Sequence, residues 1–225
     1  MTRMSVAERR VALVEAALRV IARDGVAAAT TRAIAGEAGM PQASFHYAFV
    51  SRDELMGEVI AHVVAGEERS VLPAMTPASA PSDMREALRV GLEHYLAGVQ
   101  ADPERERAMF ELAQYAQRTP GAEGLARTQY ESYFTLAQSA LRAAADLVGA
   151  RWSEPVENVA ELLVGLTDGL TSTWLATRDD AAAHRLVEFT ADAVARLSLP
   201  DPSASRTSAP GEGAHSTRER DEARA

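Results

Sequence analysis

Apolar residues recur at helical spacing along most of the chain, whereas the alternation of apolar and polar residues that is typical of strands is nearly absent. A capping box at residues 5–8 precedes the first apolar stripe, which consists of Val11, Val14, Leu18 and Ile21. Similar stripes and caps predict an all-α chain of about nine helices. Their expected ranges are 5–25, 31–38, 42–47, 51–71, 83–100, 102–118, 122–148, 153–177 and 179–197.

The most informative stretch is residues 30–55, TTRAIAGEAGMPQASFHYAFVSRDEL. Thr31 is expected to cap a short helix, and Gly39 stands where a left-handed residue ends it. Pro41 suits the first turn of the next short helix, and the capping box at residues 51–54 starts a longer one. Two short helices joined by a tight turn with glycine are typical of a helix-turn-helix, which places a recognition helix in the major groove of DNA.

This stretch resembles the N-terminal domain of the tetracycline-repressor (TetR) family of transcriptional regulators. The resemblance rests on an ordered frame made of Gly25, Thr31, Ile34, Ala35, Ala38, Gly39, Phe49, Ser51, Arg52 and Leu55. It implies a three-helix DNA-binding domain at residues 1–50 and a larger helical ligand-binding and dimerisation domain at 51–199. Residues 200–225 lack apolar periodicity and are expected to form a disordered tail.

The predicted DNA-binding domain at residues 1–50, called the reading head below, is expected to combine side chains that read bases with side chains that contact phosphates. The planar guanidinium of Arg32 can donate to the O6 and N7 acceptors of guanine. The alternative is a contact to phosphate or an ion pair with Glu37. Gln42 can pair with adenine or can simply be a solvated residue. His46, Ala48 and Val50 depart from the family pattern, which has tyrosine, histidine and lysine there. The expected DNA-binding residues are Thr31, Arg32, Pro41, Gln42, Ala43, Ser44, His46, Tyr47 and Arg52.

The expected helix at 153–177 is apolar around most of its circumference, which predicts burial on more than one side. Gly165 and Gly169 permit close approach of another helix. Together with the helix at 179–197 it predicts a four-helix interface between two copies, as the resemblance also implies; the alternative is a large monomeric core. The expected interface residues are Val159, Leu163, Leu166, Leu170, Leu186, Phe189, Ala193 and Leu197.

The resemblance also implies an effector pocket enclosed by the fourth to eighth helices. Asp168 lies in the apolar run LLVGLTDGL, and a buried carboxylate needs a partner or a ligand donor. We expect a small apolar or aromatic effector with one or two polar groups. The candidate ligand-binding residues, each of which can equally be a core residue, are His94, Tyr95, Met109, Phe110, Tyr115, Tyr130, Phe134, Asp168 and Trp174.

Charge and composition fit this interpretation. The net charge is −9, but residues 1–55 hold seven arginines and six acidic residues, so the acidity belongs to the second domain. Cysteine is absent, and no apolar run is long enough for a membrane span, which makes a cytoplasmic protein the expectation. A near-neutral reading head predicts a limited number of phosphate contacts.

An enzyme is the main rival class, and the sequence disfavours it. The five histidines are scattered, and the nucleophile-elbow, P-loop, dinucleotide-binding and zinc-protease motifs do not occur. Glu67-Glu68 and Glu104/Glu106 are interpreted as solvated helix faces. No metal or cofactor is expected. The prediction is therefore a ligand-responsive regulator that binds a near-palindromic operator as a homodimer, with repression as the commoner behaviour in the family it resembles. The alternative is a ligand-independent architectural or partner-recruiting DNA-binding protein.

Overall fold

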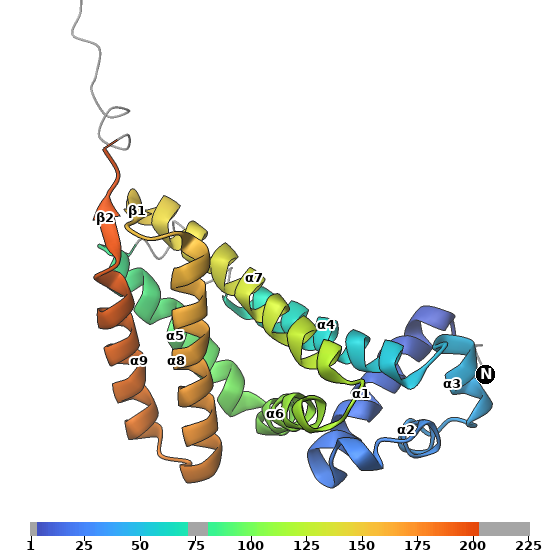
Figure 1. The fold of residues 1–225 in the computed structure, drawn as a ribbon. Coiled ribbons are helices and arrows are strands. Elements are labelled where there is room, and N and C mark those ends of the chain that lie inside the picture. The colour runs from blue at the N-terminus through green and yellow to red at the C-terminus, as the bar shows by residue number, and fades with distance from the viewer. Residues whose placement is uncertain (1–3, 72–80, 203–225) are drawn as a thin grey trace, which may run out of the picture.

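A computed structural model describes residues 4–71 and 81–202 (Figure 1). Within these ranges the chain forms nine α-helices, one short 3-10 helix and two three-residue strands, which confirms the all-α prediction. The elements are α1 (Val6–Asp24), η1 (Val26–Ala28), α2 (Thr31–Glu37), α3 (Ala43–Ala48), α4 (Arg52–Val71), α5 (Met84–Ala101), α6 (Pro103–Arg118), α7 (Glu123–Val148), β1 (Ala150–Trp152), α8 (Val156–Thr177), α9 (Asp180–Ala195) and β2 (Ser198–Pro200). The disordered tail was predicted to begin at residue 200, but Pro200 belongs to β2 and the Asp201 N–H donates to Gly149 O at 2.9 Å. From residue 203 onward the predicted tail lies outside the described residues.

Local capping sets most helix boundaries. The box at the start of α1 is formed in full, with the Ser5 hydroxyl accepting from the Glu8 N–H and the Glu8 carboxylate accepting from the Ser5 N–H. The predicted cap of α2 was wrong by one residue, because Thr30 accepts from the Ala33 N–H while Thr31 is the first helical residue. The expected start of α8 at Ser153 was also early, since the Ser153 hydroxyl donates to the Leu197 carbonyl instead.

The turn between α2 and α3 ends α2 as the sequence predicts. Gly39 has a φ of +67°, in the left-handed region that glycine adopts without strain. The Gly39 N–H donates to Gly36 O, and the Met40 N–H donates to Ala35 O at 2.8 Å. These two bonds form a Schellman motif, which closes the helix and redirects the chain into α3.

The first hydrophobic core surrounds α1 and continues beyond residue 50. Helices α2, α3 and the first half of α4 pack on one side of α1, and α6 packs on another. Helix α6 contributes Ala108, Met109 and Leu112 to this core. The reading head is therefore built on α4 and α6 as well as on its own three helices. Its largest fully buried side chains include Leu13, Ile21, Ile34, Phe45, Phe49, Leu55, Met56 and Ile60.

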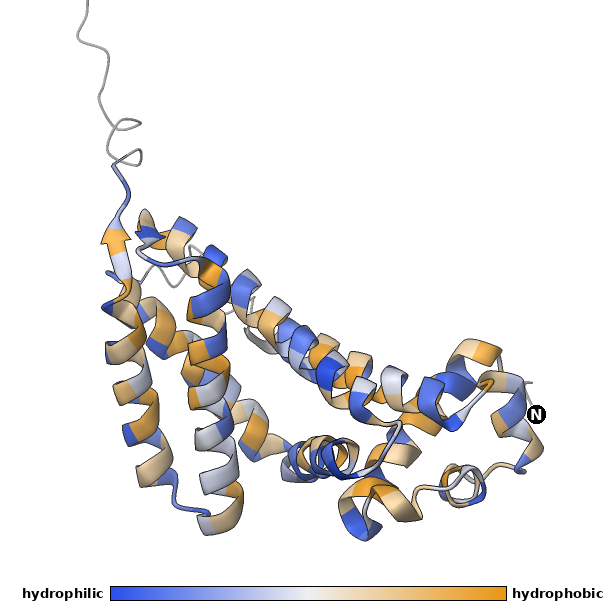
Figure 2. Cartoon of the chain, viewed as in Figure 1, coloured by the Kyte–Doolittle hydropathy of each residue, from blue (hydrophilic) through white to orange (hydrophobic). Residues whose placement is uncertain are grey.

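The second core lies between α5, α7, α8 and α9. Helices α8 and α9 run side by side and are joined by a short hydrophilic turn, as Figures 1 and 2 show. At the other end of this pair, β1 and β2 form a two-stranded antiparallel sheet, with Ala150 opposite Pro200. This two-stranded sheet was not predicted, and it holds the chain after α9 against the end of α7.

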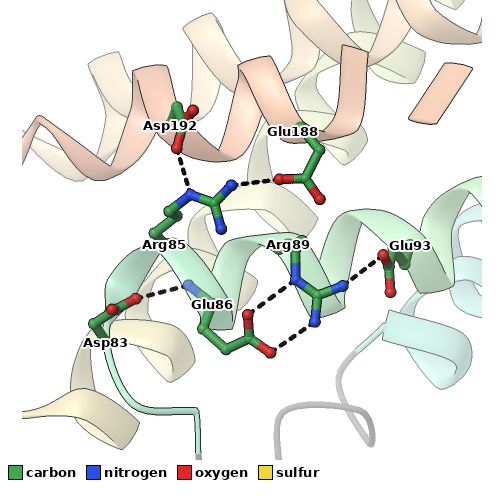
Figure 3. A network of polar contacts seen from close by, with 7 residues as sticks. All are labelled: Asp83, Arg85, Glu86, Arg89, Glu93, Glu188 and Asp192. Carbon is green, nitrogen blue, oxygen red and sulfur yellow. Dashed lines mark hydrogen bonds and ion pairs between the residues drawn. The ribbon is translucent and has the colours of Figure 1, made fainter. Parts of the chain in front are cut away.

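Ion pairs fasten α5 to α9 on the surface (Figure 3). The Arg85 guanidinium on α5 donates to Glu188 and Asp192, which lie one turn apart on α9. Along α5 itself, Arg89 bridges Glu86 and Glu93 at 2.7 Å and 2.6 Å. Such exposed pairs contribute little stability, so their main effect is to fix how α5 lies against α9.

Candidate functional site

The exposed face of α3 is the candidate DNA-reading surface. Phe45 and Phe49 are turned into the first core, with their ring centroids 5.7 Å apart. Because they point inward, the opposite side of the two-turn helix faces solvent. The Tyr47 side chain is 76% exposed. Pro41, Gln42, Ala43 and His46 are also exposed, and Ser44 is half-buried.

Arg32 is set apart by its lack of a partner. It is exposed on the first turn of α2, and among the arginines between residues 4 and 55 it alone has no hydrogen bond or ion pair in the structure. The expected alternative partner, Glu37, instead accepts from Arg19 at 3.0 Å and from Arg23 at 3.1 Å. These two arginines hold the pKa of the Glu37 carboxyl below its usual range. The Arg32 guanidinium is therefore available to an external acceptor.

Two predicted DNA contacts touch one another. The Gln42 Nε2 donates to the Thr31 hydroxyl at 3.4 Å, which links the start of α3 to the start of α2. The bond is long and exposed, so the amide can exchange it for a base edge at little cost. The predicted contacts from α2 and α3 thus form one continuous surface.

Arg52 is placed differently from the other predicted DNA contacts. Its Nε donates to Ala29 O at 2.9 Å, and a terminal nitrogen donates to Val26 O. The guanidinium also lies 5.6 Å from the centre of the Tyr115 ring on α6. Arg52 thereby ties η1, α4 and α6 together, a role that sequence reasoning did not foresee.

A cavity with a volume of about 110 Å³ lies between α4, α5, α6, α7 and α8. These are the five helices that the resemblance implied. Of the nine candidate ligand-binding residues, the structure brings five to its wall. These are Tyr95, Met109, Phe110, Tyr130 and Asp168. The Asp168 carboxylate accepts a 2.8 Å hydrogen bond from the Tyr130 phenol, and burial raises the pKa of Asp168 while this bond opposes the rise.

The other four candidates are not among the residues that line the cavity. His94 is exposed and bonds to the Val90 carbonyl of its own helix. Tyr115 faces Arg52, and Phe134 packs against the second core. The Trp174 indole donates to Asp180 at 2.7 Å and is covered by the Arg178 guanidinium, so it stabilises the turn between α8 and α9.

Sequence reasoning missed the acidic side of the cavity. Glu67 and Glu106 were interpreted as solvated, and that was wrong: they are 9% and 4% exposed and line the cavity. Their sequence neighbours Glu68 and Glu104 are more exposed, so adjacent carboxylates on one helix face opposite environments. Gln129 and Tyr133 of α7 were also missed. The helical phase of Glu67, four residues after buried Val63, was the available signal.

The predicted interface residues divide between two faces. Val159 and Leu170 are buried in the second core of their own protomer, so they have no surface left to contact another copy. Phe189 is 60% exposed, and Leu162, which was not predicted, is 55% exposed. The remaining predicted positions are half-buried: Leu163, Leu166, Leu186, Ala193 and Leu197.

Comparisons with known proteins match both halves of this architecture. Residues 13–59 match the model described as "Bacterial regulatory proteins, tetR family". Residues 84–199, more than half of the chain, match the model described as "BetI-type transcriptional repressor, C-terminal". The chain belongs to the TetR family. The first match covers α2 and α3, and the second covers α5 to α9, including most of the cavity wall.

Individual TetR-family relatives cover nearly the whole chain. The HTH-type nicotine-responsive transcriptional repressor HdnoR of Paenarthrobacter nicotinovorans is 32% identical over 191 residues, which are 85% of this chain and 96% of the relative. A solved TetR-family regulator from Mesorhizobium loti has a TM-score of 0.68 at 17% identity, covering 87% of this chain and 99% of its own. The multidrug binding protein EbrR, solved with imidazole, has a TM-score of 0.58 at 25% identity, covering 87% and 97%.

These matches make the protein a DNA-binding transcriptional regulator of the TetR type, with a reading head followed by a ligand-binding domain. Across residues 4–71 and 81–202, the structure contains no helix that is both long and apolar enough to cross a membrane.

Proposed function

We propose that this protein is a cytoplasmic repressor that binds a near-palindromic operator as a homodimer and leaves it when a small molecule occupies the cavity between α4 and α8. The observation that carries the proposal is that one chain joins an exposed reading surface to an interior cavity through a shared core. Met109 on α6 belongs to the core around α1 and also lines the cavity.

The proposed operator contacts divide by chemistry. Arg32, unpaired in the protein, reads guanine through its two-pronged guanidinium, and Gln42 reads adenine once it leaves Thr31. Ser44, His46 and Tyr47 contact phosphates. Arg52 already donates to two backbone carbonyls, so we assign it chiefly to positioning α4 beneath the reading surface.

The proposed dimer uses the outer faces of α8 and α9. Leu162 and Phe189 expose more than half of their surface, and an added side-chain carbon at Gly165 or Gly169 would meet nothing within 4 Å. Exposed apolar groups next to small residues suit the close packing of helices from a second copy. Two-fold symmetry then presents two copies of α3 at a spacing of about 34–36 Å, one turn of DNA.

The proposed response follows from α6. This helix lines the cavity with Glu106, Met109 and Phe110, and it packs against α1 and η1 on its other side. A ligand that binds better when α6 is displaced shifts the population toward conformations in which the two reading heads are spaced wrongly for the operator. Because Arg52 and Tyr115 link α4 to α6, this displacement also reaches the base of the reading head.

The test is footprinting of genomic fragments that the purified protein retains, at two salt concentrations. A protected near-palindrome of about 15–20 base pairs whose affinity falls steeply with salt supports the dimeric operator binder. Fragments that are retained without a footprint support the alternative of an architectural protein. A filled cavity that leaves the footprint unchanged contradicts ligand-dependent release.

A further inference from the structure

Three carboxylates line the cavity, and none of the described residues that line it is basic. Glu67 comes from α4, Glu106 from α6 and Asp168 from α8. Glu67 and Glu106 are almost fully buried. Removing a carboxylate from water is costly unless it is paired or hydrogen-bonded. Three carboxylates around one small cavity therefore need donors or positive charges nearby.

Only two of these three carboxylates have a hydrogen-bond or ion-pair partner among the described residues. Glu106 accepts from Arg105 at 2.7 Å, and Asp168 accepts from Tyr130. Glu67 has no hydrogen-bond or ion-pair partner among the described residues. The exposed fraction of its surface is only 9%, so its carboxylate lies mostly out of water without a donor from the described part of the chain.

A second acceptor on the cavity wall is also unpartnered. Gln129 is 2% exposed, and its Oε1 has no hydrogen-bond partner. Its Nε2 donates to Met109 O at 3.1 Å and to the Tyr133 hydroxyl at 3.2 Å, which fixes the orientation of the amide. A buried acceptor left in this way favours a donor that arrives from outside the chain.

The rest of the wall suits an organic rather than an inorganic cation. Aromatic rings attract cations over their faces, and four aromatic residues from α5, α6 and α7 line the cavity: Tyr95, Phe110, Tyr130 and Tyr133. Leucine, methionine and alanine side chains cover much of the remainder. In the described part of the chain, no three His, Asp or Glu side chains are grouped to hold a metal ion.

We propose that the effector is a small organic cation, an amine or ammonium ion, whose charge is paired with Glu67 and Asp168 and whose apolar part lies against the tyrosines. The inference rests on the proposed function, in which this cavity is the effector site, and it names the chemical class of the effector. It narrows the expectation of a small apolar or aromatic molecule with one or two polar groups by assigning a positive charge to the polar part.

Such a ligand makes binding depend on pH. Burial, together with the charges of Glu106 and Asp168, raises the pKa of Glu67 to about 8, and Arg105 opposes this rise. Glu67 is therefore mostly protonated in the empty cavity at neutral pH. A cation favours the carboxylate and releases its proton, so cation affinity rises by up to about tenfold per pH unit below pH ~8 and levels off above it. The titratable and charged groups around Glu67 are Tyr95, Arg105, Glu106, Tyr133 and Asp168.

The experiment compares two molecules of the same shape on the full-length protein without DNA. Phenyltrimethylammonium carries a permanent charge, and tert-butylbenzene is its neutral carbon analogue. Equilibrium dialysis at about pH 6 and about pH 8 gives both affinities. We expect tighter binding of the cation than of the neutral analogue, and a cation affinity that is at least about tenfold higher at the upper pH. Equal binding of the two molecules overturns the proposal, as does a cation affinity that does not change with pH.

Matched variants locate the charge. Glu67→Gln keeps the shape of the side chain and should lower cation affinity by about tenfold or more and abolish its pH dependence, while binding of tert-butylbenzene persists. Glu68→Gln removes the adjacent charge, which is exposed, and should leave all values unchanged. Equal cation affinities in these two variants overturn the proposal. If thermal unfolding shows that Glu67→Gln does not fold, Asp168→Asn takes its place and should lower cation affinity by about tenfold or more while the pH dependence persists.

These readouts separate the inference from the function on which it rests. Dialysis reports occupancy of the cavity without any operator. A cation that binds as described but leaves the footprint unchanged contradicts ligand-dependent release alone. Footprint release by neutral molecules, with no preference for cations in dialysis, contradicts the ligand class alone.

Discussion

The Tyr130 phenol on α7 donates a 2.8 Å hydrogen bond to the Asp168 carboxylate on α8. This bond joins α7 to α8 at the cavity wall, and an ion pair between Arg142 and Glu157 at 3.1 Å joins the same two helices at an exposed position. Burial is the main cause that raises the pKa of Tyr130 to about 12, and the hydrogen bond to Asp168 adds to it. The phenol therefore remains a donor throughout the physiological range and orients the Asp168 carboxylate.

Tyr130→Phe should weaken binding of phenyltrimethylammonium severalfold, because the pKa of Asp168 rises further once its hydrogen-bond donor is lost. Protein stability should fall by about 1 kcal/mol, the usual net value of one hydrogen bond. Dialysis and chemical denaturation measure the two effects. Tyr47→Phe, on the reading surface, is the control and should change neither. A cation affinity in Tyr130→Phe equal to that of the parent protein contradicts the role assigned to this bond.

Arg32→Ala should lose discrimination at one base position, by about 1–3 kcal/mol, while fold and dimer persist. The reason is that Arg32 has no partner to give up within the protein. Competition between the operator and single-base variants of it measures the effect. Arg127→Ala removes an exposed arginine of α7 and serves as the charge-matched control. Unchanged discrimination in Arg32→Ala would assign this residue to phosphate contact or to no contact.

Arg52→Ala should lower the free energy of unfolding by about 1–3 kcal/mol, since it removes the side-chain donor to the Ala29 carbonyl and one of the two donors to the Val26 carbonyl, which keeps only the Ala29 N–H. Arg52→Lys should recover only part of this loss because an ammonium group cannot reproduce the fork of the guanidinium. Denaturation in the absence of DNA is the measurement. If both variants are as stable as the parent but bind DNA more weakly, Arg52 is a phosphate contact and nothing else.

Leu162→Glu should convert the proposed dimer to monomers and abolish operator binding, because it places a charge in the exposed apolar face of α8. Sedimentation velocity measures the first effect and footprinting the second. Val6→Glu on α1 is the matched control, since Val6 and Leu162 have the same exposed fraction, 55%. A variant Leu162→Glu that remains dimeric would place the interface on another surface.

The ligand-free protein should lose stability as the pH rises toward 8. The pKa of Glu67 is about 8 in the fold and close to 4.5 in the unfolded chain, so Glu67 favours the fold most at low pH and loses this contribution as the pH passes through the folded value. Glu67→Gln should therefore raise the melting temperature at pH ~8 and leave it nearly unchanged at pH ~4. Thermal unfolding between pH ~4 and pH ~8 tests whether the melting temperature falls as the pH rises. The Glu68→Gln control should follow the parent curve at every pH.

The reading head was largely predictable because local chemistry determines it. Gly39 ends α2, and the Phe45 and Phe49 pair identifies the buried side of α3. Both signals act within one or two turns of the chain, where spacing specifies geometry. The single-residue error at Thr30 arose because two adjacent threonines offer the same capping group, and only the backbone decides between them.

The acidic side of the cavity was not predictable in the same way. Glu67 and Glu68 differ by about 100° around α4, and which of them faces inward depends on where α5 and α7 pack against that helix. Because both residues are charged, the sequence alone favoured a solvent-exposed position for each of them. The same limit applied to Val159 and Leu170, because an all-round apolar helix does not show which of its faces belongs to its own protomer.

The contribution of α6 to the core around α1 has a consequence for modular design. A segment ending at residue 71 carries every side chain of the reading surface but omits Ala108, Met109 and Leu112, which cover α1. Transplanted onto an unrelated sensor domain, that segment would expose the apolar side of α1 to water. A working chimera must therefore carry α6 with the reading head, and since α6 also forms part of the cavity wall, the graft imports part of the original ligand preference with it.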